Sequence, residues 1–155
     1  MSAFAHKDYR RHVGRLAYIA ADRLDLQYTA KSLARYLSSP CEHDVVCLKR
    51  AFRYIKGIPR LEYIINPTKA PNVLSVYSDS DWASDAVSRR STSGCIVSIE
   101  GSTLAHFSRT QPTIALSSTE AEISAIVSSS AEGLSLQNIL ALLVVLWFTQ
   151  TRKRL

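Results

Sequence analysis

Four acidic residues stand where a metal-dependent reaction on phosphodiesters could use them. Asp79 and Asp81 follow the apolar run Val73 to Tyr77, and Glu120 and Glu122 begin a long helical pattern further along the chain. Carboxylates brought together from separate elements can hold metal ions that activate water and stabilise a leaving oxygen. Acids also end strands as solvated turn residues, and negative charge is favourable in the first turn of a helix. The spacing alone therefore leaves both interpretations open.

The two glutamates are expected to face different ways. Ser117-Ser118-Thr119-Glu120 is a capping-box pattern, in which Ser117 caps the first helical turn and Glu120 reaches back. Glu122 lies about 200° further round the helix than Glu120. Glu122 is therefore the better candidate for contact with a metal ion.

A hairpin and a helix must position these acids. Gly94 to Ile99 and Ser102 to Ser108 are predicted strands, and Glu100-Gly101 is the two-residue turn that joins them. The polar stretch Ala83 to Ser93 is predicted to be a loop. In the helix after Ser117, Gly133 is a weak point. Its inward side is expected to carry the apolar residues Ile123, Ile126, Val127, Ala131 and Leu134.

The first part of the chain is predicted to be helical. Residues 1–15 are polar and basic with no clear period, and helical periodicity begins at Leu16. A second helix is predicted from Leu26 to Leu37, with Asp25 as its N-cap.

A third helix is predicted from Glu42 to Lys56, with Gly57 just after its end. Leu61 to Ile65 is predicted as a short strand. The composition of Thr68 to Asn72 is typical of a linker, so we place the boundary between two units there.

The third helix carries a basic stripe. Lys49, Arg53 and Lys56 recur at i, i+4 and i+7 on the side opposite its apolar residues. A solvated helix face accounts for such a stripe, and so does a face that contacts phosphates.

The composition indicates a globular, basic chain. The 155 residues carry a net charge of +6, with a pI near 9.4, which favours anionic partners such as nucleic acid. Arg152, Lys153 and Arg154 supply half of that excess. The three cysteines are odd in number and follow no CxxC spacing, so neither a disulfide framework nor a zinc site is indicated.

The sequence predicts an intracellular location, cytoplasmic or nuclear. The basic N-terminus has no apolar segment after it and does not resemble a secretory signal. The apolar run from Ile139 to Phe148 is shorter than the about twenty residues that a membrane span needs. We therefore expect no membrane segment.

The residues around these acids identify a protein family more specifically than the spacing of the acids does. Three segments closely resemble, in order, the ribonuclease H domain of copia-type LTR retrotransposon polyproteins: Asp79 to Ala83, Arg89 to Gly94, and Ser108 to Glu122. Upstream, Leu16 to Asp25 resembles the segment after the reverse transcriptase core, and Leu48 to Gly57 resembles the helix that precedes the ribonuclease H unit. The family usually has Arg-Pro-Asp where this chain has Arg23-Leu24-Asp25. The resemblance covers roughly residues 11–143.

The resemblance implies a reaction and a metal site. Enzymes of this family cut the RNA strand of an RNA–DNA hybrid with two magnesium ions held by four carboxylates. The first acid corresponds to Asp79 and the second to Glu122, and Asp81 is a neighbour of the site. The family's third and fourth acids follow later, but beyond Glu122 this chain has only Glu132, about 15 Å further along the helix. Half of the metal cage is expected to be missing.

These observations predict an α/β fold. Residues 1–70 are expected to form a helical connection segment following reverse transcriptase. Residues 71–155 are expected to form a truncated ribonuclease H-like domain, with three antiparallel strands and one long helix. Its open sheet edge is expected to favour association.

Three functions remain open from the sequence. The first is a polyprotein fragment of ribonuclease H descent that binds Mg²⁺ weakly and is inactive alone. The second is an active endonuclease completed by a partner chain, such as the rest of a reverse transcriptase. The third is a non-catalytic nucleic-acid-binding remnant that uses a set of basic residues, namely Lys49, Arg53, Lys56, Arg89 and Arg90.

Overall fold

The computed structural model of the chain describes the backbone of residues 3–63 and 73–151, and the side chains of residues 6–63 and 73–143. The predicted boundary at Thr68 to Asn72 lies outside these ranges. The chain divides into a helical unit, Met1–Tyr63 with Phe107–Thr110, and a second unit, Ile64–His106 with Gln111–Leu155. Each unit is described by itself.

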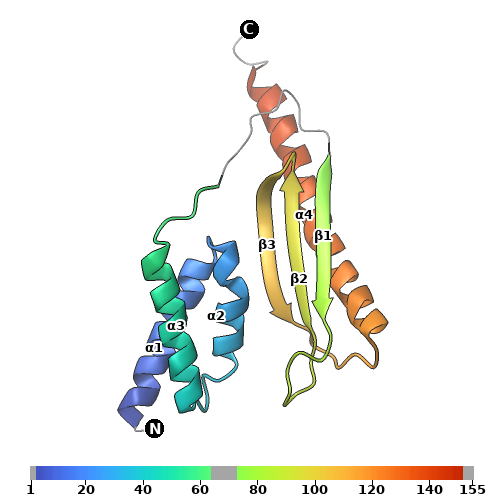
Figure 1. The fold of residues 1–155 in the computed structure, drawn as a ribbon. Coiled ribbons are helices and arrows are strands. Elements are labelled where there is room, and N and C mark those ends of the chain that lie inside the picture. The colour runs from blue at the N-terminus through green and yellow to red at the C-terminus, as the bar shows by residue number, and fades with distance from the viewer. Residues whose placement is uncertain (1–2, 64–72, 152–155) are drawn as a thin grey trace. The chain divides into compact units, whose positions relative to one another are not determined.

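The helical unit is built on α1 (Ala3–Ala20), α2 (Gln27–Ala34) and α3 (Glu42–Gly57), which surround one small apolar core (Figure 1). In α1, spacings of four, three and four residues bring the buried side chains Tyr9, Val13, Leu16 and Ala20 to one face. The expectation that residues 1–15 lack a helical period was wrong. Tyr9 belongs to this period although it carries a hydroxyl, because its ring is buried and the hydroxyl donates to the Leu33 carbonyl oxygen over 2.9 Å.

Asp25 does not cap α2. A short 3₁₀ helix, η1 (Leu24–Leu26), leads into α2, and no side chain caps the α2 N-terminus. The Asp25 carboxylate instead accepts hydrogen bonds from Arg23, at 2.9 Å from Nε and 2.7 Å from Nη2. Arg23 also donates to the Ile58 carbonyl oxygen over 3.1 Å, which ties this turn to the end of α3. Asp25 pairs with Arg23 and does not cap α2, because the buried Arg23 guanidinium requires a charged partner.

The third helix was predicted correctly, because its apolar period and both ends are local signals. Leu48 and Ala51 are buried, and Asp44 accepts from the Cys41 backbone N–H at the N-terminus over 2.8 Å. The predicted strand from Leu61 was wrong for Leu61 to Tyr63, which carry no strand. Ile64 and Ile65 lie outside the described residues.

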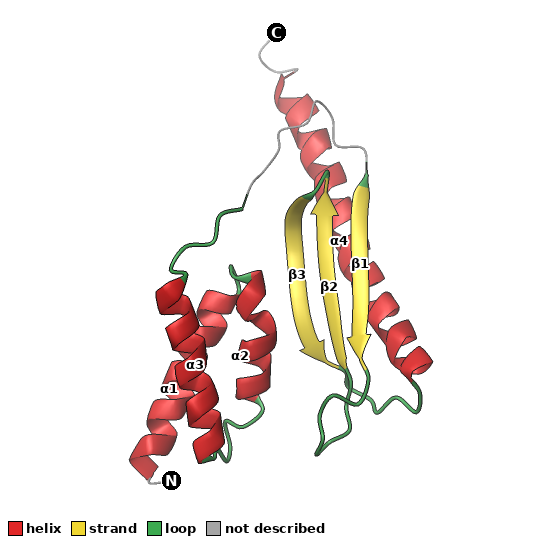
Figure 2. Cartoon of the chain, in the orientation of Figure 1, coloured by secondary structure: helices red, strands yellow, loops and turns green. Residues whose placement is uncertain are grey.

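The second unit contains a three-stranded antiparallel sheet in the order β1-β2-β3, except that the last four residues of β3, Phe107–Thr110, group with the helical unit (Figure 2). The strands are β1 (Leu74–Asp81), β2 (Thr92–Ile99) and β3 (Ser102–Thr110). Glu100 and Gly101 join β2 to β3 with φ values of 47° and 79°. Positive φ at both turn residues matches the right-handed twist of a two-residue hairpin, as the sequence predicted.

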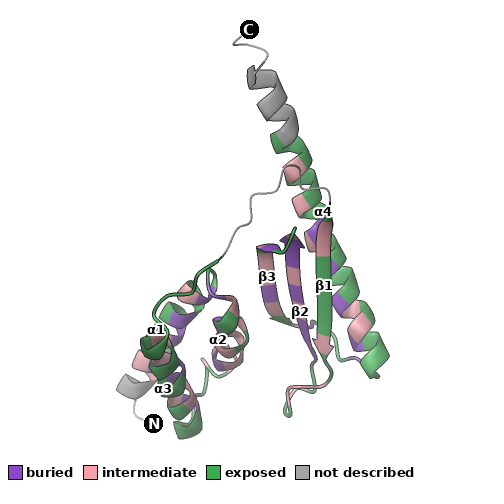
Figure 3. Ribbon diagram, turned by 45° about the horizontal axis from the view of Figure 1, so that its top comes forward, coloured by how far each residue is buried: buried purple, intermediate pink, exposed green. Residues whose placement is uncertain are grey.

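A single long helix, α4 (Ser118–Thr151), packs against β1 and β2 (Figures 1 and 3). Its sheet-facing side is small: Ala121, Ala125, Ser129 and Gly133 are buried and recur every four residues. The predicted inward set was therefore wrong, since Ile123, Ile126, Val127, Ala131 and Leu134 are all exposed. Small residues occupy the interface because the helix lies very close to the sheet. A Cβ on Gly133 would stand 2.6 Å from Cγ2 of Val76.

By length and composition, one segment of α4 is able to cross a membrane. It lies within Ser118–Leu143, where an 18-residue window reaches a mean hydropathy of 1.2, and the shorter run from Ile139 did not reveal it. Because α4 packs against β1 and β2 through its small residues, we describe it as the helix of the sheet unit.

Candidate carboxylate site at the end of the sheet

Asp79 and Asp81 are part of β1 and do not follow it. The ladder with β2 is continuous through both positions, where Asp79 pairs with Gly94 and Asp81 with Thr92. The strand therefore persists through both positions, and the two carboxylates point to the same face. Both residues are exposed.

The face that carries Asp79 follows from its neighbours. Val76 contacts Gly133 of α4, so the even-numbered β1 residues face the helix and Asp79 faces away from it. Ser93 of β2 supports the same orientation. Its hydroxyl accepts a hydrogen bond from Gln111 on the α4 side of the sheet, and Ser93 pairs with Ser80, an even-numbered residue of β1. The Asp79 side chain therefore projects from the β1–β2 layer on the side opposite α4.

Glu122 lies in the first turns of α4, on the side turned toward the sheet. It is half-buried and lies seven residues before Ser129, which returns it to nearly the same helix face. Glu120 reaches back as predicted, but its carboxylate accepts from the backbone N–H of Leu116, one residue before Ser117, over 2.7 Å. The Glu120 N–H in turn donates to the Ser117 hydroxyl over 3.2 Å.

Gln111 joins the two elements that carry these acids. Its side-chain Nε2 donates to the Ser93 hydroxyl over 2.9 Å and to the Ala121 carbonyl oxygen over 2.8 Å. Its backbone N–H donates to the Ser91 carbonyl oxygen over 2.8 Å. Gln111 is only 3% exposed, so a buried amide holds the start of α4 against β2.

A second contact closes the same end of the unit. Trp82, directly after β1, donates its indole N–H to the Ala115 carbonyl oxygen over 3.0 Å, just ahead of α4. The end of β1 and the start of α4 therefore lie at one end of the sheet, which places Asp79 and Glu122 at that end. Their side chains lie on opposite sides of the β1–β2 layer.

These acids do not fit a two-magnesium cage. Within residues 6–63 and 73–143, no group of three or more histidines, cysteines, aspartates and glutamates is placed to hold a metal ion. Glu132, the last acid in the chain, lies further along α4 and has an interaction of its own there. Acids from elsewhere in the described residues do not join Asp79 and Glu122 in such a group.

The predicted basic residues fall in two places. Arg89 and Arg90 are exposed in the loop between β1 and β2, at the same end of the sheet as Asp79. Hydrogen bonds hold this loop, including those from the Arg89 N–H to the Asp85 carbonyl oxygen over 2.8 Å and from the Ala83 N–H to the Ser91 hydroxyl over 3.0 Å. Lys49, Arg53 and Lys56 lie on α3, in the helical unit, where they border a groove.

Gln111 is the residue that the sequence analysis missed. The predicted strand ended at Ser108, whereas β3 continues to Thr110, so Gln111 directly follows the strand. A single glutamine before a proline carries no periodic signal. The only indication was its place within the segment that resembles the ribonuclease H family.

Comparison with known proteins gives the chain clear relatives. It is 36% identical over 147 residues to the "Retrovirus-related Pol polyprotein from transposon RE1" of Arabidopsis thaliana, covering 94% of this chain and 10% of that protein. It is 38% identical over 127 residues to the corresponding transposon RE2 polyprotein, covering 81% of this chain and 8% of that protein. The "Secreted RxLR effector protein 161" of Plasmopara viticola is 37% identical over 126 residues, or 80% of this chain and 87% of the effector.

The chain spans about a tenth of the length of the Pol polyproteins that it matches. No family model matches it, and neither does a solved structure. The fold described above therefore stands on the chain's own hydrogen bonds and packing.

Proposed function

The chain belongs to the family of copia-type retrotransposon Pol polyproteins, and from this we propose that it is a fragment of ribonuclease H descent that does not cleave RNA–DNA hybrids alone. One observation carries the proposal. The chain retains the first two acids of the site, Asp79 and Glu122, and the described residues offer no group that would complete it. Two-metal hydrolysis needs one ion to activate water and another to stabilise the leaving oxygen, and two acids do not hold both.

Weak magnesium binding is part of this proposal. Magnesium requires near-ideal octahedral oxygen coordination and gives up its water reluctantly. Asp79 is exposed, and Glu122 leaves from the other side of the β1–β2 layer. A cation at either residue would keep most of its water, so we derive no catalytic step through it.

We propose that the partner class is nucleic acid, contacted through Arg89 and Arg90. Both side chains are exposed, on a loop that its own hydrogen bonds hold at the Asp79 end of the sheet. Cations in this position contact phosphates without reading sequence. An intracellular location belongs to the same proposal. The word "secreted" describes the Plasmopara viticola relative and does not carry over to this chain.

Cleavage of a labelled RNA–DNA hybrid in the presence of Mg²⁺ tests the proposal. We expect the purified chain and its Asp79→Asn variant to give the same background signal. Cleavage by the wild-type chain that is lost in Asp79→Asn would overturn the proposal.

Binding of the same hybrid tests the role of the arginines. We expect affinity to fall steeply with salt and to weaken in an Arg89→Ala/Arg90→Ala variant. Salt-insensitive binding, or binding unchanged in that variant, would rule this contact out.

A further inference from the structure

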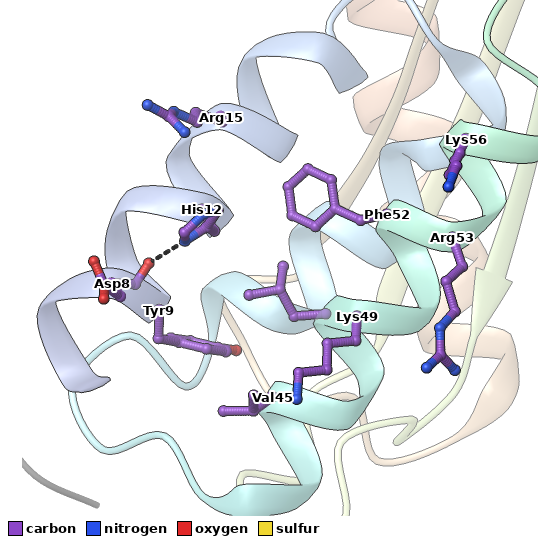
Figure 4. A pocket seen from close by; sticks show the side chains of 10 residues that line it. Asp8, Tyr9, His12, Arg15, Val45, Lys49, Phe52, Arg53 and Lys56 are labelled. Carbon is purple, nitrogen blue, oxygen red and sulfur yellow. Dashed lines mark hydrogen bonds between the residues drawn. The ribbon is translucent and has the colours of Figure 1, made fainter.

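The helical unit carries an open groove between α1 and α3 (Figure 4). Its volume is about 920 Å³. The walls come from Asp8, Tyr9, His12 and Arg15 on α1, and from α3 residues between Val45 and Lys56. Asp79 and Glu122 do not belong to this unit.

The floor of the groove is apolar and well ordered by its contacts. The rings of His12 and Phe52 meet edge to face with their centroids 5.9 Å apart. The His12 Nδ1–H donates to the Asp8 carbonyl oxygen over 2.7 Å. Tyr9 directs its hydroxyl to the Leu33 carbonyl, and burial raises the pKa of Tyr9 to about 12, with Asp44 adding to the effect. Val45 and Leu48 complete the floor.

The rim of the groove is positively charged. Lys49, Arg53 and Lys56 follow one another along α3, and Arg15 lies on the α1 side. Within residues 6–63 and 73–143, no acidic side chain forms an ion pair with any of these four cations. The one acid in the lining, Asp8, is already paired with Arg11 over 2.8 Å. A ligand that fits must therefore bring both negative charge and apolar surface.

We propose that this groove binds an acidic amphipathic α-helix. Two packed helices leave a groove into which a third helix lays its apolar side chains. The α3 cations rise by about 6 Å and then about 4.5 Å along the helix axis, and acids at i, i+4 and i+7 on a parallel-running helix rise by the same steps. The apolar stripe of that helix meets Val45, Leu48 and Phe52, and its acids meet the rim.

The shape of the floor favours a helix over nucleic acid. Binding of single strands depends on open aromatic faces on which bases stack. Tyr9 is 2% exposed, and Phe52 is half-buried with His12 against it. Aliphatic side chains such as Val45 and Leu48 offer a base no stacking surface, but they suit the leucine or isoleucine of a helix.

Fluorescence anisotropy on the full chain tests this proposal with three labelled, helix-stapled peptides. The first carries leucines at i, i+3 and i+7 with flanking glutamates, the second scrambles the same composition, and the third replaces glutamate with lysine. We expect saturable binding of the first peptide alone. No saturable binding of that peptide, or equal binding of the scrambled one, would overturn the proposal.

Two matched variants locate the binding on the groove. Lys49→Glu/Arg53→Glu reverses two exposed rim charges, and we expect it to weaken binding about tenfold or more. Arg50→Glu/Arg60→Glu also reverses two exposed charges, on α3 and just after it but outside the groove lining, and we expect an effect within about twofold. Circular dichroism melting confirms that both variants fold. Equal weakening by both would overturn the assignment.

A single-stranded oligonucleotide serves as the competing ligand. We expect it not to displace the acidic peptide. If Lys49→Glu/Arg53→Glu abolishes oligonucleotide binding and leaves peptide binding unchanged, the groove is a nucleic-acid site and the proposal is wrong.

Discussion

Gly133 of α4 lies against Val76 of β1 so closely that a Cβ at position 133 would stand 2.6 Å from the Val76 Cγ2 atom. Real Cβ atoms do not approach so closely, so the glycine sets how near α4 comes to the sheet. The same side of α4 presents Ala121, Ala125 and Ser129, all buried. The helix is therefore held by close packing of small side chains and not by its large apolar residues.

Replacing Gly133 with alanine should destabilise the second unit. The new methyl group must displace Val76 or move the helix, and overpacking of this kind costs about 1–3 kcal/mol. Urea unfolding followed by circular dichroism measures the change, and Val76→Ala in the same chain should recover most of the loss.

Gly14→Ala is the matched control for this substitution. Gly14 lies in α1, and a Cβ there meets nothing within 4 Å. Alanine should stabilise this helix by about 0.5–1 kcal/mol. If both substitutions stabilise the chain, the close approach of α4 and β1 is not real.

How far the sequence predicted the fold depended on whether the signal was local. The third helix, the capping box before α4 and the Glu100-Gly101 hairpin were correct because a few adjacent residues determine each of them. The orientation of α4 was wrong, because the usual rule turns large apolar residues inward. Here the sheet-facing side had to be small, and only the tertiary approach of β1 reveals that requirement.

The candidate site was predicted in part for the same reason. The resemblance gave Asp79 and Glu122, and strand and helix patterns placed each on its element. Neither pattern indicates which face of the sheet α4 covers. The sequence therefore could not predict that the Asp79 and Glu122 side chains lie on opposite sides of the β1–β2 layer. Gln111 was missed because a buried bridging amide depends on contacts between distant segments.

Gln111→Ala should loosen the start of α4. The substitution leaves the Ser93 hydroxyl and the Ala121 carbonyl without a buried donor, a loss of about 1–3 kcal/mol. Thermal unfolding measures it. Gln137→Ala, an exposed glutamine on the same helix, should stay within about 0.5 kcal/mol of wild type. Equal losses in the two variants would mean that the Gln111 bridge has no structural role.

The ion pair of Asp25 and Arg23 should make the helical unit sensitive to acid. Hydrogen bonds from Arg23 lower the pKa of the Asp25 carboxyl below its ordinary value. The ion pair therefore stabilises the folded state fully above about pH 4, which is the pKa of an aspartate in the unfolded chain. This stabilisation is lost as the pH falls through the lower pKa that Asp25 has in the folded state. Asp25→Asn should be less stable at neutral pH and should lose less stability on acidification.

Asp22→Asn is the control for the acid dependence. Asp22 is exposed, and its contact with Tyr63 uses the Asp22 backbone carbonyl, at 3.0 Å from the tyrosine hydroxyl. Its stability should follow the wild-type pH profile. An Asp25→Asn profile that parallels wild type would contradict the proposed linkage.

The number of metal ions that the chain binds shows whether Asp79 and Glu122 form a two-metal site. Mn²⁺, which replaces Mg²⁺ and is detected by electron paramagnetic resonance, can be titrated into the wild-type chain and into Asp79→Asn/Glu122→Gln. We expect binding with a Kd of about 1 mM or weaker, and no pair of coupled ions. Two tightly bound ions per chain in the wild type, both lost in the double variant, would contradict it.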